Sequence, residues 1–173
     1  MTDLQKHANI AEILGALMLI GGAIFGILQI REFRAQRRQA VAVELTRSFH
    51  NLDLVRAMNL ILKLPDGISA EELRSKGPEY EEAAIMISAT YEAIALLVFR
   101  KMATFSMVRE LTGGVAVVMW QKLEQWIAWM RQDLANPSWA EWFQWLAAQL
   151  ARESTDKDAH RAYERFADWR PLD

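Results

Sequence analysis

One acidic residue interrupts the most apolar part of this sequence. Glu92 stands within the run AAIMISATYEAIALLVF, where almost every neighbouring position is apolar. A carboxylate in such a helix must be paired, neutral or directed into a cavity, because an unpaired buried charge is costly. We expect a buried ion pair with Arg47 or Arg56, and the alternative is a carboxylate that binds a ligand or acts in catalysis.

The sequence contains none of the common motifs for catalysis or metal binding. It has no Cys, and its three His residues lie at no metal-ligand spacing: His7, His50 and His160. HExxH, GxSxG, a P-loop and GxGxxG are all absent from the sequence. A net charge of -2 offers no basic field for nucleic acid. We therefore expect no enzymatic activity, no metal or other cofactor and no nucleic-acid partner.

Tryptophan is concentrated in the C-terminal third of the chain. Of the seven Trp residues, most fall on the predicted buried stripes of their helices. Three project toward the edge or the polar side of the helical wheel: Trp120, Trp129 and Trp145. Packing or a partner surface is the expected use of these rings, whereas a cation-binding aromatic cage would require convergent rings that spacing alone cannot establish.

Near the N-terminus, residues 13–30 form an uncharged run of 18 residues, ILGALMLIGGAIFGILQI. As a helix rising about 1.5 Å per residue, the run covers about 27 Å, close to the thickness of a bilayer core. A cleavable signal peptide is the alternative, but the leader places Asp3 and Glu12 around its single Lys, and the apolar run is long for that role. We expect an uncleaved transmembrane helix at 13–30 after a short extracytoplasmic N-terminus at 1–12.

The charges that border this run predict its orientation. Four arginines follow it closely, whereas only Lys6 precedes it: Arg31, Arg34, Arg37 and Arg38. Basic residues remain on the cytoplasmic side, so the N-terminus should face out and the rest of the chain should be cytoplasmic. The same arginines could contact anionic lipid headgroups, although a topology signal alone explains them.

Small residues recur along one face of the predicted anchor. The residues of this stripe are Ala11, Gly15, Gly22 and Gly26, of which the last two form a GxxxG pair. Because small side chains let two helix backbones approach closely in lipid, this stripe predicts helix association, in a homo-oligomer or with another membrane protein.

The segment after the anchor, 31–64, contains no Pro or Gly and keeps apolar residues at helical spacing. It is predicted to continue the anchor as one long juxtamembrane helix. Pro65-Asp66-Gly67 is the first clear break, after which 65–173 forms the remainder of a cytoplasmic helical bundle. Two capping boxes mark helix starts in this part: Ser69 with Glu72, and Ser138 with Glu141.

The segment 79–101 is apolar around most of its circumference, which indicates a central buried helix or a second membrane span. We expect the buried helix, because a span would place Glu92 in lipid and Arg100 and Lys101 outside the cell. No strand-like alternation occurs in the sequence. The predicted class is all-α, with one N-terminal transmembrane helix continuing into a cytoplasmic helical bundle.

A series of residues along the chain resembles a known family. After the anchor and its arginines come Tyr91-Glu92-Ala93-Ile94-Ala95-Leu96-Leu97, then Val108, Leu111, Gly114, Trp120 and Arg131, then Trp142-Phe143 and Trp145-Leu146. The pattern is similar to the bacterial family catalogued as domain of unknown function 4760, from about the anchor to about Arg152. The resemblance implies a single-pass protein of a bacterial inner membrane with a cytoplasmic helical domain. It implies no known activity and transfers no catalytic residue to this chain.

These observations favour a non-enzymatic, membrane-anchored scaffold or self-associating module at the cytoplasmic face, which could be an accessory subunit of a larger membrane complex. The alternative is a membrane-anchored sensor of a ligand or lipid, with a pocket around Glu92 and the tryptophans. A deep pocket with convergent polar groups would favour the sensor, and a solid core with a large apolar patch would favour the scaffold.

Overall fold

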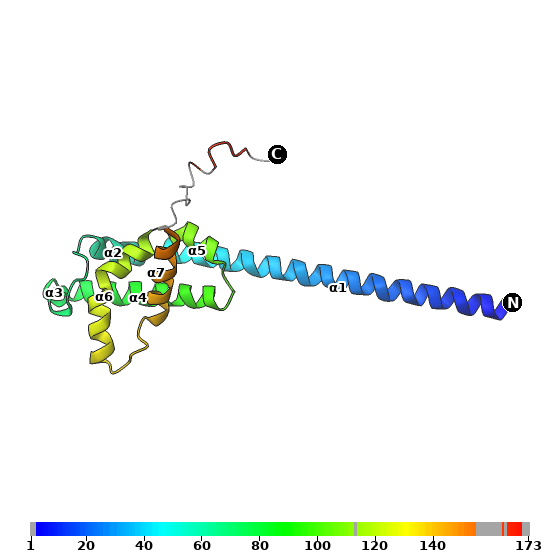
Figure 1. Cartoon of the computed structure of the whole chain (residues 1–173), viewed down its shortest axis with the longest axis horizontal. Helices are drawn as coiled ribbons and strands as arrows, with labels where there is room; N and C mark the ends of the chain where they lie inside the picture. The colour runs from blue at the N-terminus through cyan, green and yellow to red at the C-terminus, as the bar shows by residue number, and fades with distance from the viewer. Residues whose placement is uncertain (1–2, 113, 155–163, 165, 171–173) are drawn as a thin grey trace. The chain divides into compact units, whose positions relative to one another are not determined.

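The chain folds into helices only, as far as its residues are described (Figure 1). The computed structural model describes residues 3–112, 114–154, 164 and 166–170, with the side chains of 18–33, 41 and most residues from 43 onward. No strand occurs among these residues, so the predicted all-α class is confirmed. The chain divides into two compact units, Met1–Val43 and Glu44–Asp173.

Helix α1 (Asp3–Phe49) provides the described part of the first unit and reaches into the second. It ends where the His50 ring donates a hydrogen bond back to the Thr46 carbonyl oxygen over 2.7 Å. The Asn51 side chain then accepts from the Asp53 N–H over 2.9 Å and caps α2 (Leu52–Leu62). The prediction of one unbroken helix through residue 64 is therefore wrong, because the cap at Asn51 starts a separate helix.

The second unit is built around α4 (Pro78–Phe99), which begins with Pro in its first turn. It packs most extensively against α2 and α7 (Glu141–Ser154) and also contacts the three remaining helices of this unit: α3 (Ala70–Ser75), α5 (Phe105–Thr112) and α6 (Val115–Asp133). Its buried face carries many small side chains, which lets neighbouring helices approach closely: Ala83, Ala84, Ile87, Ser88, Tyr91, Ile94, Ala95 and Val98. The predicted central position of this segment is confirmed.

Helix α4 is also long and apolar enough to cross a membrane, and it is the one helix that meets this test within the described residues searched. In its most apolar window of 18 residues, 44% is buried inside the protein. A core helix of a folded unit meets the same test of length and composition, so the test alone does not assign α4 to a membrane.

The link from α2 to α3 is fastened to α6 by backbone and side-chain hydrogen bonds. The N–H groups of Gly67 and Ile68 donate to carbonyl oxygens of α6, over 2.8 and 3.1 Å. Lys122, on α6, is 9% exposed, and its ammonium donates to the Leu64 carbonyl oxygen and to the Asp66 carboxylate. The predicted break at Pro65-Asp66-Gly67 is thus a turn held by a buried cation.

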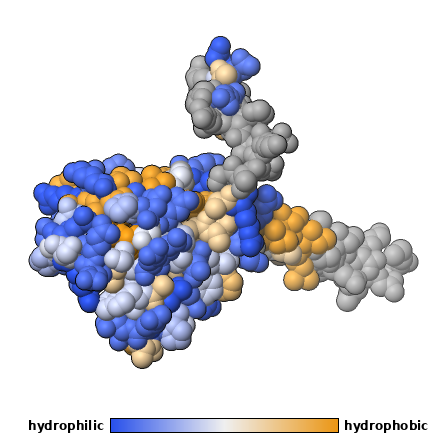
Figure 2. All heavy atoms as spheres, turned by 60° about the vertical axis from the view of Figure 1, so that its left-hand side comes forward, coloured by the Kyte–Doolittle hydropathy of each residue, from blue (hydrophilic) through white to orange (hydrophobic). Residues whose placement is uncertain are grey.

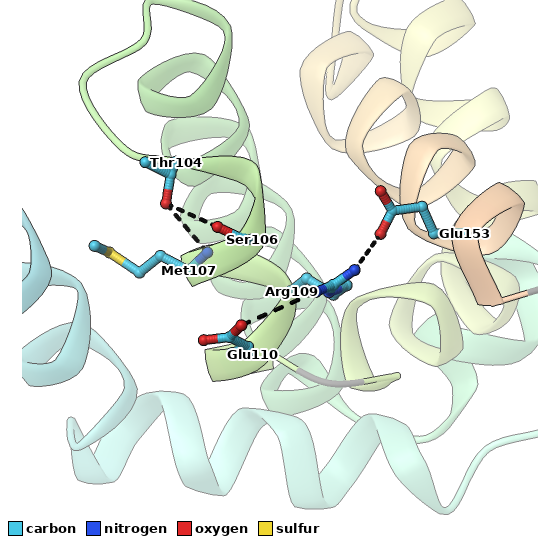
Figure 3. Close-up of polar contacts among 6 residues, drawn as sticks. All are labelled: Thr104, Ser106, Met107, Arg109, Glu110 and Glu153. Carbon is cyan, nitrogen blue, oxygen red and sulfur yellow. Dashed lines mark hydrogen bonds and ion pairs between the residues drawn. The ribbon is translucent and has the colours of Figure 1, made fainter. Parts of the chain in front are cut away.

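Local caps start the shorter helices. The Ser69 hydroxyl accepts from the Glu72 N–H over 3.2 Å at α3, as the first capping box predicts. The Thr104 hydroxyl accepts from the Met107 N–H over 3.2 Å at α5 (Figure 3). Figure 3 also shows the ion pair of Arg109 and Glu153, which joins α5 to the end of α7. The charged atoms of this pair lie 2.7 Å apart. Both side chains are partly exposed, so this pair contributes little to stability.

Replacing Lys122 with Met should lower the free energy of unfolding by about 1 to 2 kcal/mol, because the Leu64 carbonyl oxygen loses its donor. Lys76→Met is the matched control, since Lys76 is more exposed and lies 3.9 Å from its partner Glu72. The control should change stability by less than about 0.5 kcal/mol. Denaturant unfolding of both variants tests this, and equal losses would contradict the anchoring role of Lys122.

Candidate functional site

Glu92 lies on α4 beside the start of α7, and its side chain is half-buried. Its carboxylate accepts a hydrogen bond of 2.8 Å from the backbone N–H of Phe143. Phe143 is the third residue of α7, and the N–H groups of a first helical turn have no acceptor within the helix. A carboxylate at this position also interacts favourably with the helix dipole. Glu92 therefore caps a helix that begins far away in the sequence.

The start of α7 has no side-chain cap of its own. The residue before the helix, Ala140, has a φ of 55° and carries no acceptor on its side chain. The second predicted capping box, at Ser138, does not open the helix: residues 136–139 form a turn in which the Asn136 side chain accepts from the Ser138 N–H over 3.2 Å. The helix begins at Glu141 instead of directly after Ser138.

The predicted ion partners of Glu92 are corrected by this geometry. Arg56 pairs with Asp53 over 3.1 Å, and both of these side chains are exposed. Arg47 is exposed at the end of α1. Within the described part of the chain, Glu92 forms no ion pair with either arginine. The carboxylate is stabilised by a backbone donor at a helix start, which removes the need for a buried cation.

The residue before Glu92 lies in a row of aromatic rings that contact one another. Tyr91 stacks on Phe143 with ring centroids 5.0 Å apart and lies 6.3 Å from the Phe49 ring. The Trp120 ring meets Phe143 edge-on at 5.3 Å. Since Tyr91 adjoins Glu92 and Phe143 provides the N–H that Glu92 accepts, the hydrogen bond and the ring stack hold α4 and α7 in one register.

The three tryptophans predicted as a partner surface are all half-buried. Trp120 packs on Phe143, as above, and the Arg74 guanidinium lies 3.9 Å from the centre of the Trp129 ring. Trp145 meets two neighbouring rings edge-on, those of Phe99 and Trp142. Among the described residues, no ring contact joins any two of Trp120, Trp129 and Trp145. Each of these rings has an intramolecular partner, so the three do not form one cage.

A pocket of about 310 Å³ opens beside Tyr91. Apolar side chains from the end of α1, from α2 and from the α5–α6 region form most of its wall: Phe49, Val55, Met58, Leu62, Leu111 and Val115. Its polar lining residues are Tyr91, Asn59 and Thr112, and among the described residues no acidic or basic side chain lines it. Neither Glu92 nor any Trp lines the pocket, so it differs from the one that the sequence suggested around these residues.

Tyr91 is the functional candidate that the sequence interpretation missed. Its side chain is fully buried, and its hydroxyl has no hydrogen-bond partner within the part of the chain that the structure describes. Burial raises the pKa of the Tyr91 phenol from 10.0 to about 12, so the group remains a neutral donor at physiological pH. The available signal was a phenol next to Glu92 in an otherwise apolar run.

The predicted anchor lies within α1, and its described side chains are mostly exposed. A Cβ added at Gly22 or Gly26 would meet no atom within 4 Å. Helix α1 also contains the remaining predicted residues of the anchor, but beyond the backbone they lie outside the described part of the structure: Ala11, Gly15, Arg34, Arg37 and Arg38. Arg31 is exposed. No group of three His, Asp or Glu residues that could hold a metal occurs among the residues described.

An apolar N-terminal helix followed by a compact all-helical unit is thus the architecture of this protein. The chain belongs to the family described as a domain of unknown function (DUF4760), which it matches over residues 16–150. Neither the curated proteins nor the solved structures provided a match to the chain.

Glu92→Ala should lower the free energy of unfolding by about 1 to 2 kcal/mol, as the loss of a helix cap does. The amide proton of Phe143 should also exchange faster with solvent, because it loses its acceptor. Glu92→Gln should lower the free energy of unfolding by less, since the amide oxygen of Gln can still accept the hydrogen bond from the Phe143 N–H. Denaturant unfolding and hydrogen exchange measure the two effects.

Glu82→Ala is the matched control, because Glu82 is an exposed glutamate on the same helix. This variant should change the free energy of unfolding by less than about 0.5 kcal/mol. The exchange rate of the Phe143 amide proton should not change. An unchanged Phe143 amide in Glu92→Ala would contradict the capping role.

Proposed function

We propose that this protein is a non-enzymatic, single-pass membrane module that self-associates or scaffolds partner proteins at the cytoplasmic face of a bacterial inner membrane. One observation carries the proposal: large apolar side chains of α1 are exposed in the part of the anchor whose side chains are described. Met18 and Leu19 are 73% and 77% exposed, and six further residues up to position 30 exceed half: Ile20, Ile24, Phe25, Ile27, Leu28 and Ile30.

Such a continuous apolar surface requires an apolar environment, because soluble proteins rarely expose large contiguous apolar patches to water. In Figure 2 the described part of α1 is drawn mainly in orange, whereas the visible face of the second unit is largely hydrophilic. The uncharged run 13–30 matches the length of a bilayer core. Lipid is therefore the environment we propose for this segment.

The charge asymmetry around the run supports an orientation with the N-terminus outside. Four arginines follow the run within eight residues, as counted along the sequence, and one Lys precedes it. In this orientation the second unit lies in the cytoplasm. Arg31, which directly follows the run and is exposed, would contact lipid headgroups at the cytoplasmic surface of the membrane.

Self-association is supported by the spacing of Gly22 and Gly26, which puts two small residues on one face of the helix. A Cβ at Gly21, Gly22 or Gly26 would meet no atom within 4 Å, so the backbone is open at all three positions and the spacing alone selects the face. Close approach of two backbones at such a face is a main source of helix association in lipid, where the hydrophobic effect offers no drive. The partner in this proposal is a second copy of the chain or another membrane helix.

Cysteine labelling tests the anchor and its orientation in one experiment. The chain has no Cys, so Thr2→Cys and Ser154→Cys each introduce one thiol. In intact cells, a maleimide that does not cross the inner membrane should label the cysteine at position 2 and leave that at 154 unlabelled until lysis. The reverse pattern would overturn the orientation, and recovery of the protein in the soluble fraction would overturn the anchor.

The variant Leu19→Arg with Ile24→Arg should move the protein to the soluble fraction, because each Arg near the centre of a membrane helix costs about 2.5 to 3.5 kcal/mol. Met102→Arg with Leu134→Arg is the matched control. These two residues of the second unit are 50% and 49% exposed, and their replacement should leave the protein in the membrane fraction.

Replacing Gly22 and Gly26 with Leu should reduce the mass of the complex extracted in mild detergent and weaken its cross-linking, because the added side chains separate the helix backbones. The matched control is Gly21→Leu with Ala23→Leu, which adds nearly the same apolar bulk about 100° to either side of Gly22. Light scattering after size-exclusion chromatography measures the mass. An equal loss in both variants, or in neither, would contradict association through this face.

A further inference from the structure

A patch of partly exposed aromatic and apolar side chains lies where the end of α4 meets α7. The centroid of the Phe99 ring is 4.4 Å from that of Trp142 and 6.2 Å from that of Trp145. The two tryptophan centroids are 6.1 Å apart, so the three rings contact one another. Phe99 is 52% exposed, and both tryptophans are half-buried. Leu96 and Met102, each three residues from Phe99, are also exposed, and these five residues form what we call the α4–α7 patch.

The turn that follows α4 is held in a fixed shape. The N–H groups of Arg100, Lys101 and Met102 each donate to a carbonyl oxygen of α4 over 2.9 Å. Ala103 is buried and fastens the end of the turn to the core. Because the turn is already ordered, a partner that binds its exposed side chains does not have to pay for ordering the backbone.

Positive charge accompanies the apolar side chains of this turn. Arg100 and Lys101 are exposed, and among the described residues neither forms an ion pair. The sequence contains no acidic residue from 93 to 109. Glu141, at the start of α7 beside the rings, is exposed, which leaves two cations against one carboxylate around the patch. The patch therefore complements an anionic surface.

The combination of side chains points to lipid as the source of that surface. Tryptophan is enriched where a membrane meets water, because its ring is apolar and its N–H is polar. Arginine and lysine beside such rings attract anionic headgroups. Residues 31–43, which separate the predicted anchor from the second unit, span about 20 Å as a helix. With the anchor inserted, this short connection keeps the second unit at a high local concentration of lipid.

We propose that the α4–α7 patch docks onto the bilayer that holds α1, at a leaflet that contains anionic phospholipid. Phe99, Met102 and the edges of the two tryptophan rings then enter the boundary between headgroups and acyl chains. Arg100 and Lys101 contact lipid phosphates. The inference rests on the proposed membrane anchor and adds a second, reversible contact, through which the charge of the membrane controls where the second unit is held.

A single fluorophore on this Cys-free chain tests the docking. The polarity-sensitive dye nitrobenzoxadiazole is attached to Met102→Cys in the patch or, as the matched control, to Leu134→Cys at the end of α6; the original side chains are 50% and 49% exposed. Each labelled full chain is reconstituted at low density into vesicles of phosphatidylcholine alone or of phosphatidylcholine and phosphatidylglycerol in equal parts. Lipid that carries a nitroxide on its acyl chain serves as the quencher.

In the vesicles with phosphatidylglycerol, the dye at position 102 should emit at shorter wavelength and be quenched by the nitroxide lipid. In phosphatidylcholine alone it should emit nearly as in water, and the dye at position 134 should do so in both. High salt should reverse the shift, because it screens the attraction. Emission as in water at position 102 in both vesicles would overturn the proposal and indicate a protein partner for the patch. A shift without quenching, or one of equal size in both vesicles, would overturn it as well.

The two cations are tested by Arg100→Gln with Lys101→Gln. This variant should lower the ratio of docked to undocked chains about ten-fold in the anionic vesicles, because two contacts with lipid phosphate are lost. Lys63→Gln with Lys76→Gln is the matched control, since it makes the same change of net charge at two exposed lysines of the second unit outside the patch. The control should keep the shift at position 102. Equal losses in both variants would overturn the assignment to the patch.

Flotation of the vesicles on a density gradient separates failure of the docking from failure of the anchor. Every variant should float with the vesicles, because α1 holds the chain in the bilayer whether or not the patch is docked. A chain that floats while the dye at position 102 stays in water would contradict the docking alone. A chain that does not float would contradict the proposed anchor, and with it the docking that depends on the anchor.

Discussion

The hydrogen bond between the Glu92 carboxylate and the Phe143 N–H fixes where α7 begins against α4. Helix α7 follows Ala140, whose left-handed backbone conformation ends the preceding turn and whose side chain offers no acceptor. The first turn of the helix would otherwise present unsatisfied N–H groups beside an apolar core. Glu92 supplies the acceptor from the central helix, and the stack of Tyr91 on Phe143 follows from the same register.

Two charged groups of the second unit, Glu92 and Lys122, are satisfied in part or in full by backbone atoms. Glu92 accepts from a helix N–H, and Lys122 donates to the Leu64 carbonyl oxygen as well as to Asp66. Each contact joins two elements that are more than 50 residues apart. Among the described residues, four buried side-chain atoms have no hydrogen-bond partner: the Ser88 and Tyr91 hydroxyls and the ring N–H groups of Trp126 and Trp139.

The sequence by itself determined the features that depend on neighbouring residues. Its helical periodicity predicted the all-α class, and the family resemblance agrees with the match over residues 16–150. The cap at Ser69 and the break at Pro65-Asp66-Gly67 were predictable, because a side chain reaches a backbone group three residues away and Pro and Gly restrict the chain locally. The apolar circumference of 79–101 likewise predicted a central helix, since such a segment must be buried.

Only the tertiary structure decided the partners of polar groups that act over long distances. The cap of α7 comes from Glu92, 51 residues away, and no local pattern distinguishes it from the capping box at Ser138. The break at Asn51 was hidden because the apolar spacing continues through it, so a single capping side chain outweighs the periodicity. The open space beside Tyr91 depends on how three-dimensional packing leaves side chains from several helices apart, and a linear sequence does not record packing.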